Sequence, residues 1–190
     1  MKKRCEWVGE DPLSLSYHDN EWGVPIHDER KQFEFLTLEG AQAGLSWLTV
    51  LKKRENYRKA FDNFNPIKIA AYDERKIKEL LSNEGIIRNR LKIESAIQNA
   101  RAFLAVQEEY GSFDAYLWQF VGGRPKINAW KTMEDIPPKT PESDEMSQAL
   151  KKRGFKFAGS TICYSHMQAV GMVNDHTVDC FRYKEVMKIK

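Results

Sequence analysis

Two stretches from opposite ends of the chain decide the fold: Cys5-Glu6-Trp7-Val8 with Tyr17-His18-Asp19-Asn20-Glu21-Trp22-Gly23-Val24-Pro25, and Asn174-Asp175-His176-Thr177-Val178-Asp179-Cys180. They contain two of the three cysteines and two of the four histidines. A set of two Cys and two His suits tetrahedral zinc, and the four-residue step from His176 to Cys180 would place both on one face of a helix. If Cys5, His18, His176 and Cys180 meet at one ion, the two ends of the chain are joined.

The same cysteines have a simpler interpretation. Cysteine is among the most buried residue types, so Cys5 and Cys180 could be small hydrophobic core residues. The 12 residues between Cys5 and His18 also exceed the close pairing of short zinc motifs. Spacing alone therefore leaves both a zinc site and a buried pair of thiols open.

Composition is typical of a globular protein. The 190 residues are 42% hydrophobic and 30% charged, which allows one core or two small lobes that share one. No apolar run reaches the roughly 18 residues of a membrane span, and the basic start, Met1 to Trp7, has no apolar stretch behind it as a secretory signal would. Three distant cysteines argue against a disulfide framework, so we expect a cytoplasmic protein without membrane contact.

Apolar residues recur at helical spacing, and no stretch keeps the two-residue alternation of a strand, so we expect an all-α fold. The expected helices begin after Asp28 and after Ser46 (Trp47 to about Phe61), at Asn65-Pro66, after Asp73 (to Leu81, with Gly85 as the C-terminal cap), and span 88–109, 113–120, 142–153 and 160–170. Residues 1–27 read as irregular with at most one helical turn, because Asp11-Pro12 and Val24-Pro25 indicate turns. Residues 122–141 read as a loop, either a connection between lobes or a covering strap.

The segment 142–170 predicts two helices joined by a six-residue hairpin, Gly154 to Gly159. A helix that opens at Ser160, which we expect to cap it, offers free N–H groups to a phosphate, and Lys152 and Lys156 stand close by. An ordinary helical hairpin explains the segment equally well. Net charge is only +3, and the three basic clusters, at 52–54 with 58–59, at 88–92 and at 151–153 with 156, give a weak footprint for a polyanion.

Glu39 is the acidic residue that attracts attention, because its neighbours are small or apolar, such as Leu38 and Gly40. A carboxylate there is either functional or satisfied in the core. The aromatic residues nearest in sequence can hold an extruded nucleobase or simply pack in the core: Trp7, Tyr17, Trp22 and Trp47. Elsewhere, we expect Cys163 to be a buried thiol, His166 to lie on a helix surface and His27 to have no special role.

Several long motifs carry a resemblance to a known family. They are Cys-x-Trp at 5–7, Tyr-His-Asp-x-Glu-Trp-Gly-Val-Pro at 17–25, Leu-Glu-Gly-x-Gln-Ala-Gly-Leu-Ser-Trp at 38–47, Leu-Lys-Lys-Arg-Glu-Asn-Tyr-Arg at 51–58, Gly-Ile-Ile-Arg-Asn-Arg at 85–90, Lys-Lys-Arg-Gly-Phe-Lys-Phe-Ala-Gly at 151–159 and Val-Asn-Asp-His at 173–176. In this order they resemble the 3-methyladenine DNA glycosylase I (Tag) family from Cys5 to about Cys180.

The resemblance implies a helix-hairpin-helix glycosylase fold with two helical lobes, as a single domain over residues 1–190. The helix-hairpin-helix element falls at about 142–170, and a structural zinc ion joins the ends, 1–27 and 171–190. The resemblance places the zinc ligands on Cys5, His18, His176 and Cys180. It places the groups that hydrogen-bond to the base on Glu39 and Tyr17, the stacking residue on Trp47, and further pocket walls on Trp7 and Trp22.

The implied reaction is hydrolysis of the glycosidic bond of 3-methyladenine in double-stranded DNA after the base flips out. We expect DNA contacts at Lys152, Gly154, Lys156, Gly159 and Ser160, and a monomer. Relatives that also cleave the strand carry a lysine beside the hairpin, where this chain has Gly159-Ser160-Thr161-Ile162, so we expect no strand cleavage. Asp175 lies near the position of the wider fold's catalytic aspartate but adjoins His176, and it receives no such role here. Ser14 stands where an aromatic residue could have extended the pocket wall, which leaves the pocket's fine shape open.

Two other classes of function compete with this one. One is a zinc-stabilised DNA-binding module without chemistry, in which the tryptophans only pack. The other is a hydrolase that uses the zinc ion for catalysis, which needs a ligand position open to water.

Overall fold

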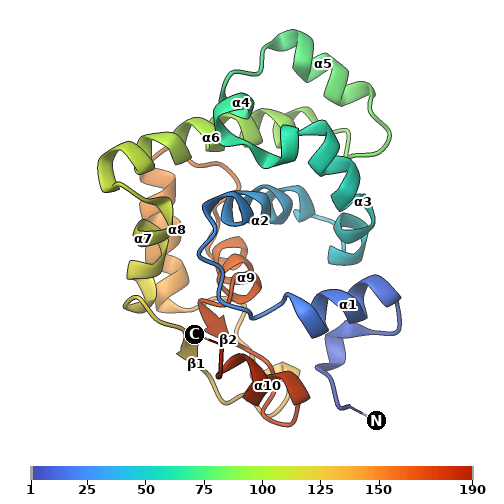
Figure 1. The fold of residues 1–190 in the computed structure, drawn as a ribbon, viewed down its shortest axis with the longest axis vertical. Coiled ribbons are helices and arrows are strands. Elements are labelled where there is room, and N and C mark those ends of the chain that lie inside the picture. The colour runs from blue at the N-terminus through green and yellow to red at the C-terminus, as the bar shows by residue number, and fades with distance from the viewer. Residues whose placement is uncertain (1, 190) are drawn as a thin grey trace.

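The computed structural model describes residues 2–189, and it is mostly helical, as expected (Figure 1). The α-helices are α1 (Pro12–Asn20), α2 (Glu29–Gln42), α3 (Trp47–Ala60), α4 (Pro66–Ala70), α5 (Glu74–Ser82), α6 (Arg90–Tyr110), α7 (Phe113–Trp118), α8 (Pro141–Lys152), α9 (Ser160–Ala169) and α10 (Phe181–Val186). Short 3-10 helices lie at Glu6–Val8, Asp62–Phe64, Gln119–Val121 and Met133–Asp135. Strands β1 (Lys126–Ile127) and β2 (Val173–Asn174) pair in parallel. Within residues 2–189 no helix is both long and apolar enough to cross a bilayer.

Side-chain caps explain where most helices begin. The carboxylate of Asp28 accepts from the N–H of Lys31 at 2.8 Å, and Ser46 and Asp73 cap α3 and α5 in the same way. Each cap satisfies one of the N–H groups that a helix start leaves without a partner. The predicted starts of α2, α3, α4 and α5 are therefore confirmed, and Gly111 ends α6 in a left-handed conformation, as expected.

Three local predictions were wrong. Residues 1–27 contain the nine-residue helix α1, because Asp11 is its N-cap and Pro12 its first residue; a proline at that position costs no hydrogen bond. Helix α5 ends at Asn83, whose side-chain oxygen accepts from the N–H of Gly85 at 2.8 Å, so Gly85 is not the cap. Gly159, rather than Ser160, is the N-cap of α9.

Helices α2 and α9 lie in the middle of the molecule and pack against each other (Figure 1). Helix α8 packs along α9, while α6 packs against α2 and α4. Helix α3 follows α2 after a short turn, and α1 contacts α3. The first and last parts of the chain, blue and red in the figure, meet in the lower half, where the N–H of Phe181 donates to the carbonyl of Lys3 at 2.9 Å.

The segment after α1 is held against the end of α9. The N–H of Gly23 donates to the carbonyl of Gln168 at 3.1 Å, and the N–H of Ile26 donates to that of Val170 at 3.0 Å. Gly171 lies against this segment with φ +71°, so closely that a β-carbon would overlap the backbone of Val24 and Pro25. Only glycine fits there, for both conformational and steric reasons.

We therefore expect Gly171→Ala to lower the free energy of unfolding by about 3 kcal/mol or more, because left-handed strain and overpacking act together. Gly122 is the matched control: it has φ +68° but no neighbour within 4 Å of a β-carbon. Gly122→Ala should cost only ~1–2 kcal/mol. Urea unfolding of both variants checks this, and equal losses would show that the contact with Val24 and Pro25 contributes nothing.

Candidate functional site

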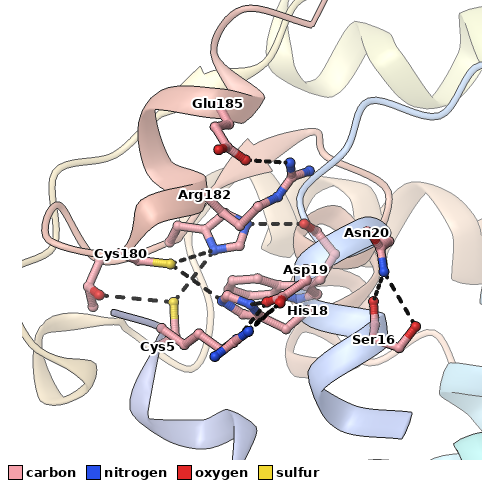
Figure 2. A network of polar contacts seen from close by, with 12 residues as sticks. Cys5, Ser16, His18, Asp19, Asn20, Cys180, Arg182 and Glu185 are labelled. Carbon is pink, nitrogen blue, oxygen red and sulfur yellow. Dashed lines mark hydrogen bonds and ion pairs between the residues drawn. The ribbon is translucent and has the colours of Figure 1, made fainter. Parts of the chain in front are cut away.

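The four predicted metal ligands meet. One donor atom from each of Cys5, His18, His176 and Cys180 lies within 4.8 Å of the others, and all four side chains are buried. The Cys5 and Cys180 sulfurs are each 3.6 Å from Nδ1 of His176, and the Cys180 sulfur is 3.5 Å from Nε2 of His18. Figure 2 shows Cys5, His18 and Cys180 pointing toward one another from the two ends of the chain. The cluster can hold a metal ion.

Hydrogen bonds from the far side of each imidazole leave the correct nitrogen free for a metal. Nδ1 of His18 contacts Asp19 at 2.8 Å, so its proton lies there and Nε2 faces the cysteines. Nε2 of His176 donates to the carbonyl of Trp22 at 3.1 Å, which leaves Nδ1 free. Nε and Nη2 of Arg4 donate to the carboxylate of Asp19 and thereby lower the pKa of this carboxyl to about 2. Such outer hydrogen bonds orient metal-binding histidines.

Next to the cluster lies a pocket of about 220 Å³. All five residues predicted for the base site line it, namely Trp7, Tyr17, Trp22, Glu39 and Trp47. The Tyr17 and Trp47 rings are 5.4 Å apart between centroids, and those of Trp7 and Trp22 are 5.0 Å apart. The volume is below that of drug-sized ligand sites, ~300 Å³ and more, and suits a single small ring system.

The pocket and the Cys/His cluster share a wall. The Trp22 ring meets the His176 ring edge-on with centroids 4.6 Å apart, and Trp7 packs against His18 at 5.6 Å. Two rings of the pocket therefore rest directly on two imidazoles of the cluster.

Polar groups in this pocket lack protein partners. Glu39 is only 4% exposed, and burial alone shifts the pKa of its carboxyl group, with no hydrogen-bond partner within residues 2–189. Burial raises its pKa to about 8. The Tyr17 hydroxyl and the indole nitrogens of Trp7 and Trp47 are also without partners in this part of the chain. Burial, followed by the nearby Glu39, raises the pKa of Tyr17. Because buried polar groups are normally paired, these atoms are ready to bind a polar ligand.

The sequence prediction missed half of the lining. The remaining residues are Gln42, Met133, Ile136, Ser165 and Gln168. Gln42 could have been found, because it follows Glu39 by three residues on the same helix and so shares its face. Met133 and Ile136 come from the predicted loop, and nothing local marks them as pocket residues. Residues 126–136 therefore form a strap that covers the pocket. This agrees with one of the two interpretations that the sequence allowed for the loop.

The predicted phosphate-binding residues lie together around the connection between α8 and α9. Lys152 and Lys156 are exposed, and no carboxylate in residues 2–189 pairs with either. Gly154 has φ +88°, and Gly159 has open space where a β-carbon would be. The Ser160 hydroxyl is 2.9 Å from that of Ser143, so it joins α9 to α8.

The other two basic clusters are largely engaged within the protein. Arg54 is buried between Glu21 and Glu34, and Lys52 pairs with Asp11 at 3.4 Å. Lys92 donates to the carbonyls of Ala41 and Ala43, both at 2.7 Å, where it secures the turn after α2. The cluster beside the α8–α9 connection keeps the most cations for an external anion.

One histidine prediction was wrong. His166 is fully buried rather than on the helix surface; burial lowers its pKa to about 4, and neither ring nitrogen has a partner among residues 2–189. His27 contacts Asp114 at 3.0 Å and stacks on Trp118, so it links the start of α2 to α7. Cys163 is buried and free, as expected.

The raised pKa of Glu39 leads us to expect that stability falls as pH rises. Its pKa rises from 4.5 to about 8 on folding, so its stabilising contribution is complete below pH 4.5 and is lost as pH rises through 8. The wild type should lose up to ~1.4 kcal/mol per pH unit between pH 5 and 8 relative to Glu39→Gln, whose amide does not titrate. Urea unfolding of both proteins from pH 5 to 9 measures the difference; parallel stability curves would show that the carboxyl group is ionised at no cost.

Comparison with known proteins places this geometry in a family. The model of the methyladenine glycosylase family matches residues 7–183. The chain is 54% identical over 181 residues to DNA-3-methyladenine glycosylase 1 of Escherichia coli (strain K12), which covers 95% of this chain and 97% of the relative. A crystal structure of 3-methyladenine DNA glycosylase I matches with 58% identity and a TM-score of 0.92, covering 94% of this chain and 98% of that one. A second such structure, in complex with 3-methyladenine, matches with 36% identity and a TM-score of 0.91, covering 94% and 96%. The chain belongs to the methyladenine glycosylase family.

Proposed function

We propose that this enzyme hydrolyses the glycosidic bond of 3-methyladenine in alkylated double-stranded DNA, as a base-excision repair glycosylase. The observation that carries the proposal is the Glu39 carboxyl group, which is buried among three tryptophans and a tyrosine and has no partner in residues 2–189. Relatives that cover nearly the whole chain bear this activity in their names, and a similar structure holds 3-methyladenine.

The chemistry of the lesion matches this pocket. Methylation at N3 makes the adenine cationic while it is attached to the sugar. Aromatic faces attract a cation, and a buried carboxylate does so more strongly. Arrival of the cation would lower the pKa of Glu39 from about 8, so that the carboxyl group ionises and accepts hydrogen bonds from the base edge. A neutral adenine offers no such compensation, and the pocket would reject it.

The reaction needs little beyond binding and orientation. Trp47 stacks on the flipped base, Trp7 and Trp22 form the walls, and Glu39 and Tyr17 hydrogen-bond to its edge. The bond between the sugar carbon and the base breaks, and its electron pair neutralises the charge of the departing base. A water molecule supplies the oxygen that bonds to the sugar carbon and releases a proton.

Strand cleavage requires an amine that attacks the sugar, and none of the residues that line the pocket is a lysine. We therefore propose a monofunctional enzyme. Lys152 and Lys156, with the backbone of Gly154, Gly159 and Ser160, would contact DNA phosphates through a helix-hairpin-helix element over about 142–170. Such contacts are independent of base sequence and weaken with salt.

Zinc fits the Cys/His cluster. Around a tetrahedral zinc ion with the usual bond lengths, sulfur and nitrogen ligands lie about 3.6 Å apart. Three of the four sulfur–nitrogen distances here are 3.5, 3.6 and 3.6 Å, and all four donor atoms lie within 4.8 Å of one another. When bound, the ion would link the two ends of the chain. It would hold no catalytic water, because all four ligand positions would be filled by Cys5, His18, His176 and Cys180. This argues against a hydrolase that uses the metal for catalysis.

Three further expectations remain part of the proposal. The chain would act as one domain and as a monomer. Its three free cysteines suit the reducing cytoplasm.

Chromatography of the bases released from methylated duplex DNA tests the function. We expect the wild type to release 3-methyladenine but not 7-methylguanine, and to leave the strand intact. Glu39→Gln should lower kcat/KM by about 10²-fold or more, as the loss of a preorganised electrostatic group does. Glu108→Gln, on the exposed face of α6, is the matched control and should be unchanged. No release by folded, zinc-loaded wild type would leave only a DNA-binding module.

Metal analysis tests the zinc site. We expect about one zinc ion per chain in the wild type and far less in Cys180→Ser, together with a lower midpoint of thermal unfolding, because metal binding contributes folding free energy. Cys163→Ser changes an equally buried thiol outside the cluster and should keep the metal. Full zinc content in Cys180→Ser would remove Cys180 from the ligand set.

A further inference from the structure

One buried carboxylate outside the pocket joins two segments that line it, the strap and α9. Asp175 is 1% exposed and accepts four side-chain hydrogen bonds. One oxygen accepts from Asn128 at 2.7 Å and from Trp130 Nε1 at 2.8 Å. The other accepts from the Tyr164 hydroxyl at 2.6 Å and from Gln168 Nε2 at 2.7 Å.

The first pair of donors belongs to the strap, residues 126–136. Further bonds hold the strap to the segment after α9: the N–H of Lys126 donates to the carbonyl of Met172 at 2.9 Å, and that of Val178 donates to the carbonyl of Trp130 at 2.9 Å. Three residues beyond Trp130, the strap delivers Met133 and then Ile136 to the wall of the pocket. The second pair of donors is on α9, where Gln168 itself lines the pocket.

A carboxylate with four donors is fully occupied, so Asp175 has no free lone pair directed at a substrate. Its role is instead to fix the positions of the side chains that donate to it. Charge-assisted hydrogen bonds are the strong ones, and here they hold the strap and Gln168 at a common point behind the pocket.

We propose that Asp175 is a positioning residue that sets the size selectivity of the base pocket by holding the strap, and with it Met133 and Ile136, against the bound base. The proposal rests on the proposed glycosylase function. A wall of two apolar side chains excludes bulkier bases only while it cannot retreat, and one extra methylene group in such a pocket is worth ~10- to 200-fold in discrimination.

The experiment compares the rates of release of 3-methyladenine and of the bulkier 3-methylguanine and 7-methylguanine from methylated duplex DNA. Met133→Ala shortens the wall directly and should raise the relative release of a bulkier base about tenfold. Trp130→Phe removes one bond to Asp175 without touching the pocket and should shift the ratio in the same direction. Asp175→Ala should shift it further, and Asp175→Asn, which keeps an acceptor for the strap, should restore part of the selectivity.

Trp118→Phe is the matched control, because Trp118 is a buried tryptophan whose Nε1 donates to the carbonyl of Ile26 at 3.3 Å, outside the pocket. The ratio of its release rates, bulkier base over 3-methyladenine, should equal that of the wild type. Zinc content is measured for every variant, since Asp175 adjoins His176.

The outcomes separate the two proposals. If the wild type releases no base, the proposed function fails. If the wild type is active and Trp130→Phe and Asp175→Asn, folded and zinc-loaded, keep the wild-type ratio, Asp175 and the strap do not set selectivity. A loss of stability with an unchanged ratio would likewise make Asp175 a structural residue only.

Discussion

The meeting of two thiols and two imidazoles from opposite ends of the chain is the constraint on which the rest of the structure depends. Cys5 and His18 arrive from the first 20 residues, and His176 and Cys180 from the last 20. Trp22 and Trp7 pack on these imidazoles, so the cluster fixes both its own geometry and one wall of the pocket. The buried side chains of both ends and of the intervening helices belong to one continuous core, so joining the ends also holds that core together.

The pocket contains buried polar groups whose burial destabilises the empty protein. Burying Glu39 without a partner costs free energy, which the structure meets by keeping the group protonated. The unpaired Tyr17 hydroxyl and indole nitrogens add to this cost. A cationic base that supplies the missing partners would regain it, so under the proposed function the same groups that weaken the empty protein would favour the charged lesion over normal bases.

Helix α9 connects the two sides of this arrangement. Its N-terminal end adjoins the exposed Lys152 and Lys156 of the α8–α9 connection, and its C-terminal half carries Ser165 and Gln168 into the pocket. Asp175 follows directly and holds the strap to the same helix. A rigid element that spans from a phosphate-binding end to a base pocket would fix the distance between backbone and flipped base.

The sequence by itself determined the helices that local chemistry specifies, such as α2, α3 and α5, because a cap such as Asp28, Ser46 or Asp73 acts within three residues. Its motifs, through the family resemblance, also predicted which side chains would gather in the Cys/His cluster and in the pocket, and the structure brings them together there. Helix α1 was missed because Asp11-Pro12 serves a turn and a helix start equally well. Only the tertiary structure decided that His166 is buried, that β1 pairs with β2, and that Met133 and Ile136 reach the pocket. Those facts depend on contacts between residues far apart in the chain, whose free energy no local pattern records.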